Sequence, residues 1–452
     1  MLWKRLRDTT HPSFTLNLLS RTLWEVSIIL FGTASSIIIA RCLGPYGKGV
    51  INTLQQFLGF AGSLAVPGLY PALQYHIAAG KCDVKEGVAN YVFFTLVYSC
   101  PFTFVLLLLS PFFTHNILKG VPIAILLISL LIFFVSAFFS PLSITLSALQ
   151  RFPQLAFCGL LSLTAKLFLL FFFLVILKMD LWGAFLPDWL LLPLGTYLGF
   201  YFLSDVLTLS SFKPRFNKAL LKSLLSYGLK VFTAGILGLT TLRVDVFFVN
   251  SFLSPTAVGL YMTGVSYTEL IRFIPSAVST VLFPRVAASG EAQAKELATF
   301  ITRSFPLYLF PVSAILFLSA PLIIPLLYGA KFIPSIRVVS FLLPGIFFWC
   351  YSAQLGDYLA GRGYPEFTLY SISIATLITL VGDFLLIPVM GINGAAFVSS
   401  LAYFSHFLLL LYFFRLNTGS TLSEILLTKK DDVLYLWKIL KEKGVKLEKL
   451  FK

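Results

Sequence analysis

The sequence contains few charged residues. Only 12% of its 452 residues are Asp, Glu, Lys or Arg, and 58% are apolar. A soluble domain carries about 25% charged residues and roughly half apolar ones. A water-soluble core cannot bury this much apolar surface, so lipid must cover the excess. The composition therefore excludes an independent soluble domain.

Cysteine and histidine are also scarce. The five cysteines are odd in number and scattered, and none of them forms a C-x-x-C pair (Cys42, Cys82, Cys100, Cys158 and Cys350). None of the four histidines lies near them at the spacing of a ligand set. Buried, inert thiols are typical of this pattern. We therefore expect no disulfide framework, no metal and no cofactor.

Long apolar stretches fill the rest of the chain. A span needs about 20 mainly apolar residues to cross the hydrocarbon core of a membrane. Such windows predict an all-α polytopic membrane protein of about twelve transmembrane helices. They lie near residues 17–40, 50–79, 89–111, 122–149, 154–178, 183–208, 222–252, 258–287, 299–328, 334–360, 366–388 and 393–415.

Lysine and arginine are distributed unevenly over the two sides that these windows define. Most lie on the side of the termini; those on the other side are Arg41, Lys48, Lys119, Lys178, Lys331 and Arg337. Cytoplasmic loops carry the excess of Lys and Arg. This predicts a multi-pass protein of the inner (cytoplasmic) membrane with both termini in the cytoplasm. The net charge of +15 then faces anionic headgroups, and we expect no nucleic-acid partner.

A seven-residue pattern, L-x-P-x-x-x-G, occurs twice, at 43–49 and at 253–259. Three further boundary motifs repeat in the same order at nearly the same offset: Ser110-Pro111 with Ala320-Pro321, 151–153 with 362–365, and 179–184 with 390–395. They predict two parallel six-helix repeats (lobes) around a central cavity, as in transporters whose substrate site lies between the repeats. The predicted parts are a lobe at 1–208, a cytoplasmic linker at 209–221, a lobe at 222–415 and a basic amphipathic tail at 416–452.

Three cations lie well inside the predicted spans: Lys166, Arg243 and Arg272. Ionisable residues are costly there, so they face a cavity or a partner. A cationic interior suits a phosphate-bearing substrate, because guanidinium groups bind phosphate oxygens in pairs. We expect these three residues to bind substrate. Lys166 has no acid nearby in the sequence, and snorkelling or a distant partner is the alternative explanation.

The acids of the spans are candidates for coupling ions or for ion pairs: Glu25, Asp245 and Glu269. Glu269 and Arg272 share a helix face and can simply neutralise each other. Arg243 and Asp245 point to nearly opposite faces, so each needs its own partner.

Other charged or polar residues of the spans are expected to be structural. His76 and His406 are predicted to be packing residues. Lys230 is predicted to lie near the inner surface, and Asp357 and Asp383 to be interfacial.

The segment 40–49 resembles the signature that follows the first helix of oligosaccharide (O-antigen type) flippases, the polysaccharide transporter branch of the multidrug/oligosaccharidyl-lipid/polysaccharide exporter superfamily. Further matches are Asp245 with 253–261, 327–332 and 391–396, and the resemblance covers residues 15–415. It implies two six-helix lobes, a cavity that opens alternately to each leaflet, and a polyprenyl-pyrophosphate-linked oligosaccharide as substrate. The related lipid II flippases usually carry two extra C-terminal helices, which this sequence does not show.

The expected function is therefore a flippase for cell-surface polysaccharide biosynthesis. Its expected partners are the lipid-linked oligosaccharide, membrane lipids and other polysaccharide-assembly membrane proteins. An organic-cation or drug antiporter of the same superfamily is the first alternative, although it would need an anionic cavity. A membrane polymerase or ligase of lipid-linked glycans would need acids or bases on its outer loops. Asp180 is the only obvious carboxylate there, so we expect no enzyme and no catalytic residue.

Overall fold

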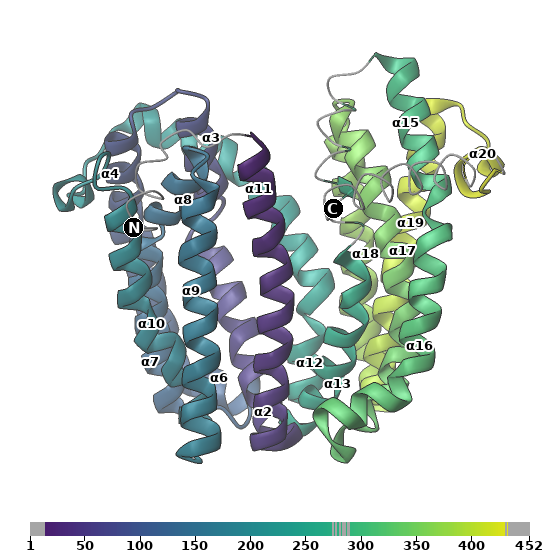
Figure 1. Ribbon diagram of the computed structural model, residues 1–452, viewed down its shortest axis with the longest axis horizontal. Helices are drawn as coiled ribbons and strands as arrows, with labels where there is room; N and C mark the ends of the chain where they lie inside the picture. The colour runs from purple at the N-terminus through teal and green to yellow at the C-terminus, as the bar shows by residue number, and fades with distance from the viewer. Residues whose placement is uncertain are drawn as a thin grey trace, which may run out of the picture. The chain divides into compact units, whose positions relative to one another are not determined.

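The computed structural model describes residues 14–273, 275, 278, 279, 282, 286, 290–429 and 432, with side chains from residue 23 onward. Every regular element within those residues is helical (Figure 1). Most of the predicted tail helix lies outside the described residues.

The chain divides into two compact units. The first unit is Met1–Leu239, Val246–Leu260 and Leu327–Lys331; the second unit is Thr240–Asp245, Tyr261–Leu326 and Phe332–Lys452.

The helices follow one another with short connections. Up to the predicted linker they are α2 (Phe14–Ala65), α3 (Leu69–Ala78), α4 (Val84–Phe94), η1 (Thr95–Ser99), α5 (Cys100–Leu108), α6 (Ser110–Asn116), α7 (Ile123–Phe139), α8 (Pro141–Ala148), α9 (Phe152–Leu170), η2 (Phe171–Ile176), α10 (Leu181–Phe202) and η3 (Leu209–Phe212). After it come α11 (Lys218–Arg243), α12 (Asp245–Phe252), α13 (Pro255–Thr268), η4 (Glu269–Arg272), α15 (Glu291–Ser304), α16 (Pro306–Tyr328), η5 (Ala330–Phe332), α17 (Ser335–Gly361), α18 (Pro365–Met390), α19 (Ile392–Thr418) and α20 (Leu422–Leu426).

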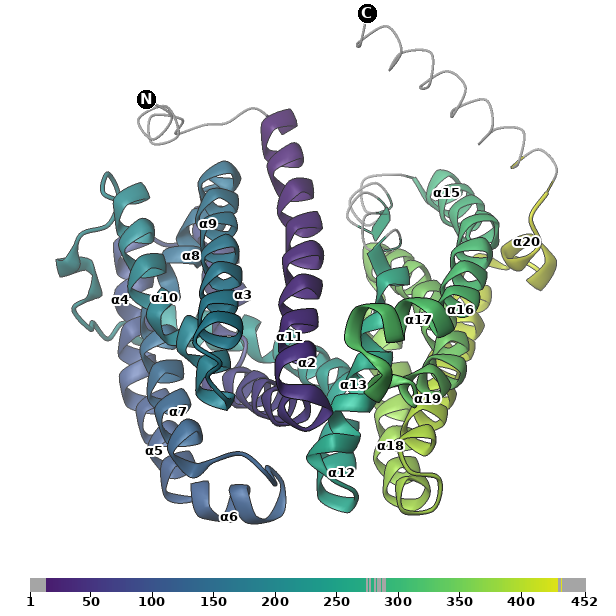
Figure 2. The same cartoon turned by 60° about the horizontal axis from the view of Figure 1, so that its bottom comes forward.

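Nine helical stretches of the described residues are long and apolar enough to cross a membrane. The all-helical membrane fold is thus confirmed, whereas the predicted count of twelve is not. The first predicted span and part of the second lie in α2, in which two helical segments meet at a kink at Gly44 (φ 65°, ψ −169°), just before Pro45 (Figure 2). Helix α10, which contains Asp188 and two prolines, is not among these nine stretches. The eighth predicted span extends beyond the described residues.

The two copies of the repeated L-x-P-x-x-x-G pattern lie against each other in the first unit. A side-chain carbon on Gly49 would overlap the carbonyl oxygen of Pro255, and one on Gly259 would overlap the carbonyl oxygen of Pro45. Only glycine allows two helices to approach so closely. The contact is reciprocal: the glycine of each copy meets the proline of the other.

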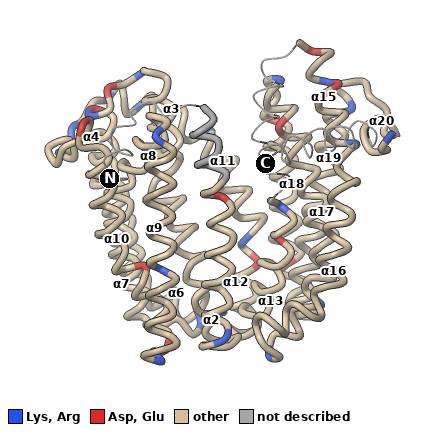
Figure 3. Tube along the Cα trace, in the orientation of Figure 1, with Lys and Arg blue, Asp and Glu red and all other residues tan. Residues whose placement is uncertain are grey.

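Cations on the predicted outer side bind backbone and ring atoms of the first unit. Arg41 donates from Nε to the Leu327 carbonyl at 2.8 Å, and Lys119 donates to the Ser251 carbonyl at 2.5 Å. Lys48 is buried, donates to Ser36 Oγ at 2.9 Å and lies 4.1 Å from the centroid of a tyrosine ring. In both units, charged positions gather toward the ends of the helices and few lie between (Figure 3).

The core of the second unit is built around α19, which packs on α17 and α18. Small residues allow this approach. A side-chain carbon on Gly382 would lie 2.7 Å from Val398. Gly345 similarly lies directly against Ser400. These contacts bring polar residues of α18 and α19 toward the junction of α11 and α12.

Candidate functional site

Two of the three predicted cations meet in the second unit. Arg243 ends α11, and Glu269 and Arg272 both lie in η4. Arg243 Nη2 lies 2.7 Å from Glu269 Oε1, and Arg272 Nη1 lies 3.0 Å from the same oxygen. The side chains of Arg243, Glu269 and Arg272 are 19%, 22% and 36% exposed. One carboxylate is thus shared by two guanidinium groups, and the cluster keeps one net positive charge.

Asp245, two residues after Arg243, belongs to a second group of polar side chains, which is more deeply buried than the arginine cluster. It begins α12 and is 2% exposed. Its Oδ2 accepts hydrogen bonds from the hydroxyl of Tyr261 and, at 3.3 Å, from that of Ser399. Arg243 and Asp245 therefore reach different partners, although only one residue separates them.

Asp383 joins this second group. The sequence predicts that it is interfacial, and in the structure its side chain is fully buried within the protein, in α18. Neither of its carboxylate oxygens has a hydrogen-bond partner among the described residues, and it lies within electrostatic range of Asp245. A buried carboxyl group without a partner is either neutral or binds a cation.

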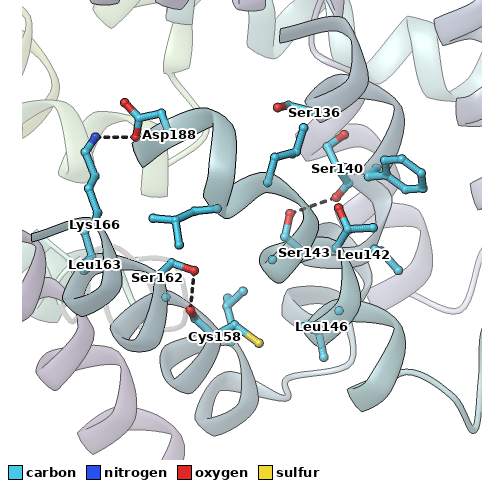
Figure 4. A pocket seen from close by; sticks show the side chains of 18 of the residues that line it. Ser136, Ser140, Leu142, Ser143, Leu146, Cys158, Ser162, Leu163, Lys166 and Asp188 are labelled. Atoms are coloured by element: carbon cyan, nitrogen blue, oxygen red, sulfur yellow. Dashed lines mark hydrogen bonds and ion pairs between the residues drawn. The ribbon is translucent and has the colours of Figure 1, made fainter. Parts of the chain in front are cut away.

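Lys166 lies in the first unit and forms an ion pair with Asp188 of α10, Nζ to Oδ1 at 2.6 Å. The sequence prediction missed this acid because it lies on the following helix. Figure 4 shows the two side chains pointing toward each other beside a cavity of about 560 Å³. The positive charge of Lys166 at that cavity is therefore neutralised by Asp188.

Serine hydroxyls line the same cavity. Ser136, Ser143 and Ser162 each donate to a carbonyl of their own helix. A hydroxyl oxygen that donates its hydrogen can still accept a hydrogen bond. Figure 4 shows the labelled serines around this cavity. The ring of Trp24 lies directly on Gly159, where any side chain would displace it. The last predicted site residue, Glu25, is exposed on α2 of the first unit.

Residues 38–337 match the model of a family described as "Polysaccharide biosynthesis protein". The match covers most of the chain, which belongs to this family. The resemblance to polysaccharide transporters noted in the sequence is thereby confirmed.

Two curated relatives are similar over part of their length. An uncharacterized membrane protein of Methanocaldococcus jannaschii is 25% identical over 209 residues, which are 44% of this chain and 41% of that protein. A probable low-salt glycan biosynthesis flippase of Haloferax volcanii is 24% identical over 195 residues, which are 42% of this chain and 41% of that protein. The chain thus matches about two fifths of the length of each relative.

Solved structures share the fold. An inward-facing multidrug resistance MATE family transporter of the MOP superfamily superposes with a TM-score of 0.64 at 17% identity and covers 92% of this chain and 97% of that one. The lipid II flippase MurJ in an inward closed conformation gives a TM-score of 0.68 at 15% identity and covers 87% of both chains. At these identities the likeness establishes the fold alone.

Proposed function

We propose that this protein is a flippase that moves a polyprenyl-pyrophosphate-linked oligosaccharide from the cytoplasmic to the outer leaflet by alternating access, for cell-surface polysaccharide biosynthesis. The observation that carries the proposal is the pair of arginines around Glu269 in the second unit. The family and the named glycan flippase among its relatives support it. In this proposal the lobes are residues 1–208 and 222–415, and both termini are cytoplasmic.

The chemistry of the arginine cluster suits a pyrophosphate group. A guanidinium group has five N–H donors, and among the described residues Arg243 and Arg272 each direct one nitrogen to Glu269. The remaining donors are available to phosphate oxygens, which bind guanidinium groups in pairs. Outward movement of an anionic headgroup also gains about 2.3 kcal/mol per charge per 100 mV of inside-negative potential.

Asp245 and Asp383 are proposed to take up the coupling ion, a proton or a sodium ion. Both are buried, and Asp383 has no hydrogen-bond partner among the described residues. Uptake of a cation removes the cost of burying this charge. Lys166 remains a proposed substrate contact; the substrate would have to compete with Asp188 for it. Other polysaccharide-assembly proteins remain proposed partners.

The test replaces Arg243 and Arg272 by Ala, singly, in cells that export the glycan. We expect each variant to lose glycan export at unchanged protein level, measured by surface glycan staining and by immunoblot of the membrane fraction. Arg337→Ala is the matched control, because Arg337 is an exposed arginine of α17 in the same unit. Normal export from both variants would overturn the cationic-site mechanism.

An organic-cation antiporter is the second candidate function. The buried acids Asp245 and Asp383 favour it, and the MATE fold is equally compatible with it. Ethidium efflux from cells separates the two functions. The flippase predicts no efflux above that of cells without the protein. Efflux that is lost in Asp383→Asn, together with normal glycan export, would establish the antiporter.

A further inference from the structure

A cationic cavity lies in the first unit, between the end of α3 and the beginning of α11. Its volume is about 470 Å³, and its lining includes Lys81, Lys222 and Lys230 together with two tyrosines and two serines. The described residues that line it include no Asp or Glu. The three positive charges are therefore not balanced within the cavity.

The two helices that form its walls are held in backbone contact. Gly68, with φ 69°, precedes α3, and a side-chain carbon on Gly228 would lie 2.7 Å from the Gly68 carbonyl oxygen. Tyr75 of α3 and Tyr227 of α11 stack with ring centroids 4.5 Å apart and planes within 3°. The positions of the lysines on these walls are thus set by close packing.

A buried histidine ties the walls together. His76 is 3% exposed, and its Nδ1 lies 2.8 Å from the Ala72 carbonyl oxygen, which can only accept. Nδ1 therefore donates, and in the neutral ring Nε2 accepts from the hydroxyl of Ser223 at 2.8 Å. His76 has the structural role that the sequence predicted, and the ligand-binding groups of the cavity are the lysines and hydroxyls around it.

The donors of the cavity are available. Lys81 Nζ donates to the hydroxyl oxygen of Tyr75 at 2.8 Å, which leaves the hydrogen of that hydroxyl for another acceptor. Lys222 and Lys230 are exposed and form no ion pair among the described residues. The sequence predicted only that Lys230 lies near the surface, because the packing of α3 on α11 is not visible in the sequence.

A neighbouring cavity of the first unit provides the contrast. Lys85 and Lys218 line it together with Asp83 and Glu86, so its lysines have acids beside them. Figure 3 shows positively and negatively charged positions interspersed around α4. The absence of acids from the lining of the cavity between α3 and α11 is thus not a general property of this part of the molecule.

We propose that the cavity between α3 and α11 binds a phosphate-bearing lipid headgroup. Lysine ammonium groups bind phosphate as point charges, and hydroxyl hydrogens add directional donors. Helix α11 begins a stretch apolar enough to span a membrane, so the cavity lies at the level where headgroups are found. The headgroup belongs either to an anionic phospholipid or to a polyprenyl pyrophosphate. The site needs no export activity and does not rest on the arginine cluster.

The experiment measures lipid binding to the purified full chain in detergent. The probes are phosphatidylglycerol, polyprenyl pyrophosphate and the zwitterionic phosphatidylcholine, and native mass spectrometry counts the bound lipid. The test variant is K222Q/K230Q. The control K85Q/K218Q removes the same charge from the neighbouring cavity. We expect the test variant to bind at least one anionic probe at least tenfold more weakly than wild type, and the control to bind within twofold of wild type.

The two anionic probes identify the source of the headgroup: the one whose binding falls in K222Q/K230Q is the ligand. Ser226→Glu, which places an acid in the lining, should weaken the same probe. Unchanged binding of both anionic probes to K222Q/K230Q would overturn the site, as would an equal loss in K85Q/K218Q or an equal loss of phosphatidylcholine. Because binding is measured without transport, failure of the flippase proposal would leave this result unaffected.

Discussion

The charged residues within the helices are neutralised differently in the two units. In the first unit, Lys166 meets Asp188 one to one, and the acid is 43% exposed. In the second unit, two arginines share Glu269, which is 22% exposed. A one-to-one pair at a half-exposed position has no charge left to offer a ligand. The two arginines and Glu269 together carry one net positive charge, which Asp245 partly offsets because it lies within electrostatic range of Arg243. The second unit is therefore the better candidate for binding an anion.

Among the ion pairs compared, removal of Glu269 should lower the free energy of unfolding the most. Glu269→Gln leaves Arg243 and Arg272 half-buried next to each other without the carboxylate that they share. Of the described acids, only Asp245 then remains within electrostatic range of Arg243. Breaking a buried ion pair from one side typically costs 3–5 kcal/mol, and we expect about 3 kcal/mol of unfolding free energy here because the residues are partly exposed. The measurement is reversible unfolding in mixed micelles with sodium dodecyl sulfate. The double variant R243Q/E269Q should recover part of the loss, and a Glu269→Gln stability within about 0.5 kcal/mol of wild type would remove the distinction between the units.

Removal of Asp188 should have a smaller effect. Asp188→Asn leaves Lys166, whose side chain is 25% exposed and can reach solvent. Exposed ion pairs contribute about 0.2–1 kcal/mol, and we expect a loss in that range in the same unfolding assay. Lys166→Gln should cost no more. A loss as large as that of Glu269→Gln would show that the first unit depends on its charges to the same degree.

The smallest expected effect concerns an ion pair of the first unit that lies at helix ends, between Arg151 before α9 and Asp205 after α10. Arg151 precedes α9, and its Nη2 lies 2.5 Å from Asp205 Oδ2; the side chains are 7% and 48% exposed. The hydrogen bond from Arg151 holds the pKa of Asp205 below its ordinary value of 3.8. A lowered pKa adds stability above the ordinary pKa, and this stability is lost as the pH falls through the folded-state pKa.

Wild type should therefore exceed Asp205→Asn in stability by less than about 1 kcal/mol at pH 7, since Asp205 is half-exposed. The difference should shrink below pH 4. Thermal unfolding at pH 7 and at pH 3 checks this. A difference that grows on acidification would contradict the sign of the pKa shift.

Much of the fold could be predicted from the sequence, because apolar stretches and Gly-Pro boundaries are local signals. The break between the first two predicted spans is one of these local signals, because Gly44 has non-helical dihedral angles and interrupts α2 just before Pro45. The complete burial of Asp383 within the protein was not predicted. A predicted span ends where its apolar residues end, whereas burial depends on the helices that pack around it.

The candidate site was predicted in part. Local spacing pointed to Glu269 as a partner of Arg272, since residues three apart share a helix face. The contact of Arg243 with the same carboxylate, and that of Lys166 with Asp188, join different helices. The cavity between α3 and α11 depends on the contact between Gly68 and Gly228. Such contacts arise from packing, and a single sequence does not specify them.

The reciprocal contact of Gly49 with Pro255 and of Gly259 with Pro45 has the form of an isologous interface. In such an interface one patch meets a second copy of itself, so residue i touches j and j touches i. Both copies of this patch occur here in one chain, at matching positions of an internal duplication. A half-length ancestor with a single copy would already have carried both sides of the contact and could have paired with itself as a twofold dimer. Gene fusion would then have joined two subunits that fitted each other beforehand.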